Sequence, residues 1–176
     1  MQILQIGRLS NDVNAHMERE YGACALWQQT QIDEFLQQYG ANFELVVTSA
    51  AYGLTAAHMA MLPNLRAVCS FGVGYDSIDV AALQQNSIVL SNTPDVLTDC
   101  VADLAMGLLI DVSRGISAGD RYARAGLWGS KQRMGMGTRV TGKKLGILGL
   151  GRIGLAIAER AQGFKMNIGY HNRKPV

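Results

Sequence analysis

Short apolar runs alternate with amphipathic stretches along the first half of the chain. The runs have the length of buried strands, and the stretches between them place apolar residues three or four positions apart, as helices do. Strands are expected at residues 2–7, 23–27, 44–48, 65–70 and 88–91. Strands that alternate with helices in this way predict a mostly parallel sheet with helices on both faces.

Polar residues with short side chains mark where the intervening helices begin. Asn11 or Asp12 is expected to cap the first helix, Thr55 a later one, and Ser77 or Asp79 the last of this half. Such side chains accept hydrogen bonds from the free amides of a first helical turn. The pattern therefore predicts an α/β domain whose strands all run into loops at one edge of the sheet, where ligands bind in such folds.

The sequence Asn92-Thr93-Pro94 interrupts this alternation and is taken as a domain boundary, giving domains at residues 1–94 and 95–176. A long helix follows, capped by Thr98 or Asp99, with one wide apolar face. That face comprises Val101, Leu104, Ala105, Leu108, Leu109 and Val112. Residues 115–138 are too long for a tight connection and too apolar for a plain linker. They fit either an extended arm that packs on a neighbouring part or on a second subunit, or a mobile surface loop.

The most informative stretch is 143–173. A short apolar strand (145–148) runs into a G-x-G-x-x-G sequence formed by Gly149, Gly151 and Gly154, and a helical pattern and a second strand follow. This is the order of a β-α-β dinucleotide-binding unit. In such units the first glycine permits the turn, the second lets the backbone approach a pyrophosphate, and the third lets helix and strand pack closely.

The end of the second strand indicates which dinucleotide is bound. An NAD site has Asp or Glu about 20 residues beyond the first glycine, where it accepts from the ribose hydroxyls. This chain has His171, Asn172, Arg173 and Lys174 there. A carboxylate would repel a ribose 2′-phosphate, whereas Arg beside Lys can bind one. The sequence predicts NADP(H) with NAD(H) as second choice; the alternative is a solvated basic turn.

A second glycine-containing loop, Gly72-Val73-Gly74-Tyr75-Asp76, follows the expected strand at 65–70. Two glycines at such a point let backbone amides turn into a cleft, where they can hold a small carboxylate. An ordinary strand-to-helix turn explains the same residues equally well. Tyr52, in the loop after the preceding strand, is either a pocket wall or a packed loop residue.

Composition narrows the class of protein. The 176 residues carry a net charge of +2, without a basic cluster dense enough to indicate a nucleic-acid partner. No apolar run is long enough to span a bilayer, and no secretory leader pattern opens the chain. Cys24, Cys69 and Cys100 are widely spaced, show no metal-binding pattern, and are expected to be buried thiols in a reducing compartment. We therefore expect a cytoplasmic protein without a metal site.

In combination, these motifs identify a family. The succession G-V-G-Y-D-S-I-D, S-N-T-P-D-V-L-T-D-C-V-A-D-L-A, R-x-G-x-W and G-K-K-L-G-I-L-G-L-G-R-I-G resembles the D-isomer-specific 2-hydroxyacid dehydrogenases. The similarity is greatest to their NADP-dependent hydroxypyruvate/glyoxylate and hydroxyphenylpyruvate reductases. It extends over the whole chain. It implies a flavodoxin-like substrate domain followed by the first β-α-β of a Rossmann dinucleotide-binding domain.

The resemblance also implies roles for individual residues. Val73 and Gly74 would present backbone amides to the carboxylate of a small 2-keto or 2-hydroxy acid such as glyoxylate or hydroxypyruvate. The arm around Trp128 would lie in a homodimer interface, and Asp103 stands where many members carry Glu. Cofactor-binding positions would be Gly149, Leu150, Gly151, Arg152, Ile153 and Gly154 for the pyrophosphate, and Asn172, Arg173 and Lys174 for the adenosine ribose phosphate.

No catalytic residue is assigned within this chain. Members of the family use an Arg and a Glu-assisted His, which lie downstream of the segment that ends here, and His16, His58 and His171 match none of them. We therefore expect this chain to be the N-terminal part of an oxidoreductase, inactive alone. The alternatives are a non-catalytic nucleotide-binding or dimerisation module of the same fold, and an inactive truncated product.

Overall fold

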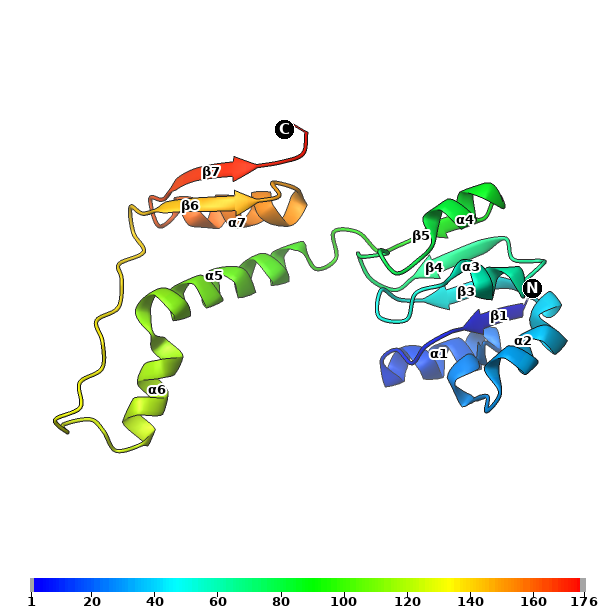
Figure 1. The fold of residues 1–176 in the computed structure, drawn as a ribbon, viewed down its shortest axis with the longest axis horizontal. Helices are drawn as coiled ribbons and strands as arrows, with labels where there is room; N and C mark the ends of the chain where they lie inside the picture. Colours follow the sequence, from blue (N-terminus) through cyan, green and yellow to red (C-terminus); the bar gives the residue numbers. More distant parts are fainter. Residues whose placement is uncertain (1, 175–176) are drawn as a thin grey trace. The chain divides into compact units, whose positions relative to one another are not determined.

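The computed structural model describes residues 2–174; Met1 and residues 175–176, at the outer ends of the two predicted domains, lie outside the described residues. The chain forms two compact units, residues 1–94 and 95–176 (Figure 1). The division follows Pro94, where the sequence pattern also breaks. The functions of the two units stay predictions.

The first unit is built on a five-stranded parallel sheet in the order β2-β1-β3-β4-β5. This is the flavodoxin-like order, and it confirms the predicted fold class. Strand β1 lies between β2 and β3, so the strand order reverses its direction at β1. In such sheets ligands bind beyond the carboxyl ends of the strands at this reversal point. The strands are β1 (Gln2–Gln5), β2 (Cys24–Ala25), β3 (Phe43–Thr48), β4 (Ala67–Ser70) and β5 (Val89–Ser91).

Helices cover this sheet and enclose one apolar core. They are α1 (Asn11–Tyr21), α2 (Ile32–Tyr39), α3 (Ala56–Ala60) and α4 (Val80–Gln85), with 3-10 turns at Leu26–Gln28 and Gly40–Asn42. Leu4, Val46 and Val68 are fully buried on adjacent central strands, each stabilising the fold by about 1.5–3 kcal/mol. The strand expected at 23–27 is shorter than predicted, because the chain turns at Leu26 to bury that side chain.

The predicted helix caps are partly confirmed. The Thr55 hydroxyl accepts from the His58 amide at 3.2 Å, and Asp79 Oδ1 accepts from the Ala82 amide at 3.0 Å. The prediction for α1 was wrong, since Ser10 occupies its cap position without a side-chain bond. In its place, Asn14 Oδ1 accepts from the Leu9 amide at 3.0 Å and ties the start of the helix to the preceding loop.

The second unit contains the predicted β-α-β motif. Strands β6 (Lys144–Leu148) and β7 (Asn167–His171) pair in parallel, with Leu148 opposite His171. The connecting helix α7 (Arg152–Gln162) lies along one face of the pair, and α5 (Thr98–Arg114) lies beside α7 (Figure 1). Ala156, Ala158 and Ala161 are buried, so α7 packs through small side chains.

Helix α5 and the segment after it differ from expectation. Neither Thr98 nor Asp99 caps the helix; Leu97 holds that position without a side-chain bond. The apolar face expected on α5 is largely exposed, with Val112 84% accessible, whereas Ala102 and Met106 are the buried residues. The segment expected as either an extended arm or a surface loop begins as helix α6 (Ile116–Arg124) and is irregular only after it.

Within residues 2–174, no helix is long and apolar enough to cross a membrane, and no cluster of three His, Cys, Asp or Glu residues could hold a metal ion. The cysteines are free. The prediction that all are buried was wrong: Cys100 is exposed, and Cys24 and Cys69 are partly buried. Burial raises the pKa of the Cys24 thiol above its ordinary value.

Candidate functional site

The glycine loop (Gly149–Gly154) joins β6 to α7, and its glycines do different things. Gly149 has φ +97°, a conformation that side chains with a Cβ rarely adopt. A Cβ on Gly154 would lie 2.3 Å from the Gly149 carbonyl oxygen, so close packing of α7 on the loop requires glycine there. A Cβ on Gly151 would meet nothing within 4 Å, so the backbone at Gly151 borders open space.

The loop leaves a run of amides without acceptors. The Gly149 amide donates to the His171 carbonyl at 2.9 Å, and the first helical bond of α7 runs from the Leu155 amide to the Gly151 carbonyl at 2.8 Å. Between these two bonds, the amides of 151–154 have no acceptor among the described residues. Free amides at the positive end of a helix dipole form a site for an anion such as a pyrophosphate.

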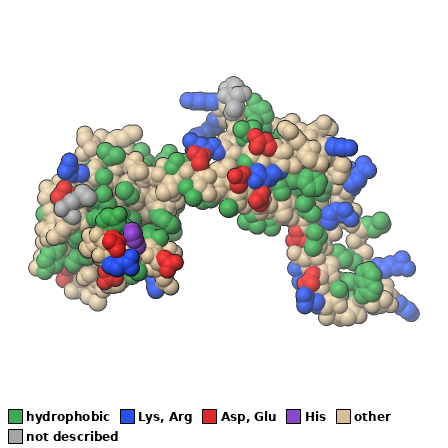
Figure 2. Space-filling view, turned by 180° about the vertical axis from the view of Figure 1, so that it is seen from behind, with side chains coloured by type: hydrophobic (Ala, Val, Ile, Leu, Met, Phe, Trp, Pro, Cys, Tyr) green, Lys and Arg blue, Asp and Glu red, His purple; other side chains and the backbone are tan. Residues whose placement is uncertain are grey.

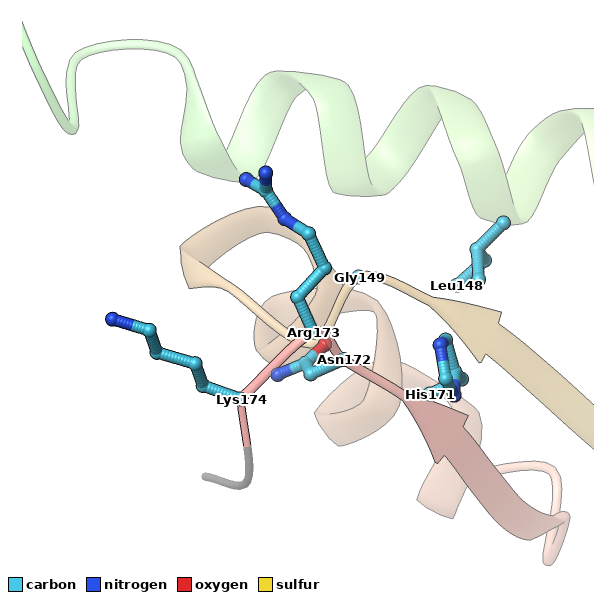
Figure 3. A pocket seen from close by; sticks show the side chains of 6 residues that line it. All are labelled: Leu148, Gly149, His171, Asn172, Arg173 and Lys174. Carbon is cyan, nitrogen blue, oxygen red and sulfur yellow. The ribbon is translucent and has the colours of Figure 1, made fainter.

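Basic side chains border this loop from the end of β7 (Figure 3). A recess of about 740 Å³ is lined by Leu148, Gly149, His171, Asn172, Arg173 and Lys174. Arg173 and Lys174 extend from the strand end in directions different from that of His171 (Figure 3). Among the described residues, no Asp or Glu lines the recess, so nothing there opposes a phosphate group.

Surface ion pairs connect both ends of α7 to other residues of the second unit. Arg152 Nε lies 2.9 Å from Asp95 Oδ1. Arg160 donates to Asp103 Oδ1 at 2.6 Å and to Asp99 Oδ1 at 2.9 Å, and these bonds, that to Asp103 first, raise the pKa of the Arg160 guanidinium. Figure 2 shows acidic and basic side chains next to each other on this unit. Asp103 thus links α5 to α7. The sequence does not predict this role, because Arg160 lies 57 positions away along the chain.

In the first unit, hydrogen bonds to its carbonyl groups hold the Gly72–Gly74 loop after β4. The Gly72 carbonyl accepts from the Thr93 amide at 2.9 Å. The Val73 carbonyl accepts from Asn92 Nδ2 at 2.9 Å, and the Gly74 carbonyl accepts from the Ser70 hydroxyl at 3.3 Å. The amides of Val73 and Gly74 have no acceptor within residues 2–174. The loop therefore offers donors with its acceptors already occupied, which suits an anion such as a carboxylate. Sequence reasoning named the loop but missed the residues that hold it.

The point at which the sheet order reverses is also occupied by a fixed loop. A Cβ on Gly7, just after β1, would lie 2.1 Å from the Tyr52 ring, so the ring rests directly on the Gly7 backbone. The Thr48 hydroxyl, fully buried, donates to the Gly53 carbonyl at 2.7 Å. Ser77 closes the same loop by donating to the Ala50 carbonyl at 2.6 Å. The Tyr52 ring thus has a fixed place beside the carboxyl ends of β1 and β3, and half of its surface is exposed.

The histidines do not gather at either loop of the first unit. His16 is exposed on α1, where its ring makes an edge contact with Tyr21 at 5.6 Å. His58 lies in α3, and His171 ends β7 beside the glycine loop.

These features define a class: an α/β protein with a flavodoxin-like unit and a nucleotide-binding β-α-β unit. Residues 106–176 match the NAD binding domain of the D-isomer specific 2-hydroxyacid dehydrogenases. Together with relatives that align over nearly all its residues, this match places the chain in the D-isomer specific 2-hydroxyacid dehydrogenase family.

Among its relatives, a glyoxylate/hydroxypyruvate reductase A of Arabidopsis thaliana is 37% identical over 97% of this chain. A hydroxyphenylpyruvate reductase of Plectranthus scutellarioides is 37% identical over the same share. Both alignments cover 54% of the relative. The chain therefore spans about half the length of the curated relatives it matches.

Solved structures agree. A 2-hydroxyacid dehydrogenase from Ketogulonicigenium vulgare superposes with a TM-score of 0.90 at 34% identity, over 99% of this chain and 55% of that one. An NADPH-dependent glyoxylate/hydroxypyruvate reductase from Sinorhizobium meliloti, in complex with NADP and malonate, gives 0.83 at 32% identity, over 99% and 54%. The family and fold predicted from the motifs are thereby confirmed.

Proposed function

We propose that the second unit binds NADP(H) in preference to NAD(H). The observation that carries this proposal is the run of acceptor-free amides at 151–154 beside Arg173 and Lys174, in a recess without a lining carboxylate. The amides would hold the pyrophosphate that both cofactors share. Arg173 and Lys174 would pair with the 2′-phosphate that only NADP(H) carries.

We propose further that the Val73 and Gly74 amides bind the carboxylate of a small 2-keto or 2-hydroxy acid, with glyoxylate and hydroxypyruvate as the first candidates. Support comes from the occupied carbonyls and free amides of this loop. The names of the relatives agree with this substrate class. The loop would hold the carboxylate of such an acid through these two amides.

A cofactor titration tests the first proposal. NADPH and NADH are titrated into the chain, and binding is followed by the fluorescence of the reduced nicotinamide. We expect tighter binding of NADPH, and Arg173→Ala should weaken NADPH binding by about tenfold or more while leaving NADH binding nearly unchanged. Lys131→Ala, which removes an exposed cation outside the recess, is the matched control. Tighter binding of NADH by the wild-type chain would overturn the preference.

The proposed activity is that of an oxidoreductase, with the catalytic acid and the carbonyl-polarising cation outside this chain. The 176-residue chain should accordingly bind NADPH and show no NADPH-dependent reduction of glyoxylate or hydroxypyruvate. Steady-state absorbance at 340 nm measures this turnover. Turnover by the pure chain would contradict the absence of a catalytic set.

We also propose that α6 and the segment after it contribute to a homodimer. Trp128 is 84% exposed and Met136 fully exposed, and hydrophobic side chains lie beside basic ones over this end of the unit (Figure 2). Exposed apolar surface of this kind is typical of interaction sites. Light scattering after size exclusion should give twice the chain mass, and Trp128→Ser should shift the population toward monomer.

A further inference from the structure

Asn172 lies immediately after β7, yet its side chain turns back to the loop after β6 (Figure 3). Its Oδ1 accepts from the Leu150 amide at 2.6 Å. Its Nδ2 approaches the Leu150 carbonyl at 3.5 Å. Asn172 therefore contacts both polar groups of one residue that lies 22 positions earlier in the chain.

This pair of contacts extends the strand pairing by one step. The last backbone rung runs from the Gly149 amide to the His171 carbonyl at 2.9 Å. Beyond this bond the two strands separate, and the Asn172 carboxamide takes the place of the next backbone hydrogen bond. Since the Leu150 amide is occupied, the free amides start at Gly151. The position of Leu150 thus sets where the amides of the first turn of α7 point.

The neighbouring Arg173 and Lys174 behave differently. In the described part of the chain, neither side chain has a hydrogen-bond partner, and both residues are exposed. The two side chains extend from the strand end in different directions (Figure 3). They are free to meet a ligand, whereas the carboxamide of Asn172 is already engaged. The sequence assigns residues 172–174 as a whole to the ribose phosphate. Within the described residues 2–174, only Asn172 of these three has its side chain bonded to the protein.

We propose that Asn172 is a positioning residue that holds the Leu150 peptide so that the amides of 151–154 receive the pyrophosphate. Selection of the 2′-phosphate belongs to Arg173 and Lys174 alone. The inference rests on the proposed cofactor site and assigns Asn172 a role within it. It predicts that Asn172 matters equally for NADPH and NADH, because the pyrophosphate is common to both.

A carboxamide suits this position because Leu150 offers an amide donor and a carbonyl acceptor. The Asn side chain carries an oxygen that accepts and an NH2 group that donates. Asn172→Ala removes both contacts. Asn172→Ser keeps a hydroxyl that can accept from the Leu150 amide. Losing a hydrogen bond of this kind corresponds to a factor of roughly three to ten in an equilibrium constant.

The experiment combines two measurements on the 176-residue chain. Amide hydrogen exchange reports on Leu150 directly: its amide should be protected in the wild type, should exchange about three- to tenfold faster in Asn172→Ala, and should be partly protected again in Asn172→Ser. Titration with NADPH and NADH should show Asn172→Ala losing the same factor for both. Arg173→Ala is the matched control and should lose NADPH affinity only.

The outcomes separate this inference from the proposed function. If Asn172→Ala weakens NADPH and spares NADH, Asn172 is a 2′-phosphate ligand and the positioning role is refuted. If Leu150 exchange is the same in wild type and Asn172→Ala, the clamp itself is refuted. If the wild-type chain binds neither nucleotide, the proposed function and the pyrophosphate step fall together, and the exchange rate of Leu150 still decides whether Asn172 holds the loop.

Discussion

Two glycines of the glycine loop, only three positions apart, should respond to alanine in opposite ways. In Gly154→Ala, the new methyl would lie 2.3 Å from the Gly149 carbonyl oxygen and 3.3 Å from Ile147 Cγ2. The oxygen belongs to the backbone and cannot rotate away. The start of α7 must therefore retreat by about 1 Å to restore an ordinary 3.4 Å contact.

The magnitude follows from two opposing terms. Overpacking of this kind costs about 1–3 kcal/mol. Replacing glycine by alanine within a helix returns up to about 1 kcal/mol. Taking the middle of the overpacking range, about 2 kcal/mol, the net destabilisation of Gly154→Ala should be about 1–2 kcal/mol, which lowers the unfolding midpoint of a unit of this size by roughly 5–15 °C.

Gly151→Ala should leave stability nearly unchanged. Its φ of −91° and ψ of −160° are open to alanine, and its methyl would meet no protein atom within 4 Å. We expect a stability change within about 0.5 kcal/mol. The methyl would, however, enter the space beside the free amides, so NADPH affinity should fall by about tenfold or more.

Urea unfolding and NADPH titration of both variants and the wild type test this reasoning together. Gly154→Ala should be the unstable variant, and Gly151→Ala the stable one that binds poorly. A Gly154→Ala protein with the wild-type midpoint would show that the Gly149–Gly154 contact does not limit packing. Unimpaired NADPH binding by Gly151→Ala would show that the pyrophosphate does not approach this backbone.

Three further outcomes are expected. Thr48→Val removes the hydroxyl that bonds the Gly53 carbonyl inside the core, so unfolding in urea should show the first unit destabilised by about 1–3 kcal/mol; an unchanged midpoint would contradict this. The side chain and then the amide of Ser117 hold the pKa of the Asp111 carboxyl below its ordinary value. The stabilisation from Asp111 is therefore present above the unfolded pKa of about 3.9 and is lost as pH falls through the lower folded value. The melting temperatures of wild type and Asp111→Asn should differ at pH 7 and begin to converge once pH falls below the unfolded value of about 3.9, and a constant gap would oppose the assignment. Asn92→Ala frees the Val73 carbonyl and should raise the KM for a 2-keto acid severalfold in an active protein that contains this chain, with the KM for NADPH unchanged; equal effects on both would refute a local role.

Motifs with short-range physical causes were predictable from the sequence. The β-α-β unit follows from apolar periodicity and glycine spacing, and Gly149 and Gly154 have the turn and packing geometry expected of them. The parallel sheet follows from alternating strands and helices. The same local reasoning located the Gly72–Gly74 loop, because two glycines after a buried strand mark a turn that exposes amides.

Features that depend on long-range partners were not predictable. The periodicity of α5 indicates an apolar face, but which side is buried depends on the packing of α5 along α7. The buried residues of α5 are Ala102 and Met106. Asn92 and Asn172 are ordinary polar residues in the sequence. Their roles arise from carbonyls and amides that lie 19 and 22 positions away. No local pattern identifies such pairs.

The chemistry of the donors in the Gly72–Gly74 loop determines how anion binding there would depend on pH. Its donors are peptide N–H groups, which do not titrate in the physiological range, and its carbonyls are held by a hydroxyl, a carboxamide and another peptide amide. Anion affinity built in this way has no pKa of its own. A carboxylate held there would keep its affinity from mildly acidic to mildly alkaline solution. The pH dependence of a reaction at this loop would then report on titrating side chains, the proton donor among them, and not on the peptide donors that hold the anion.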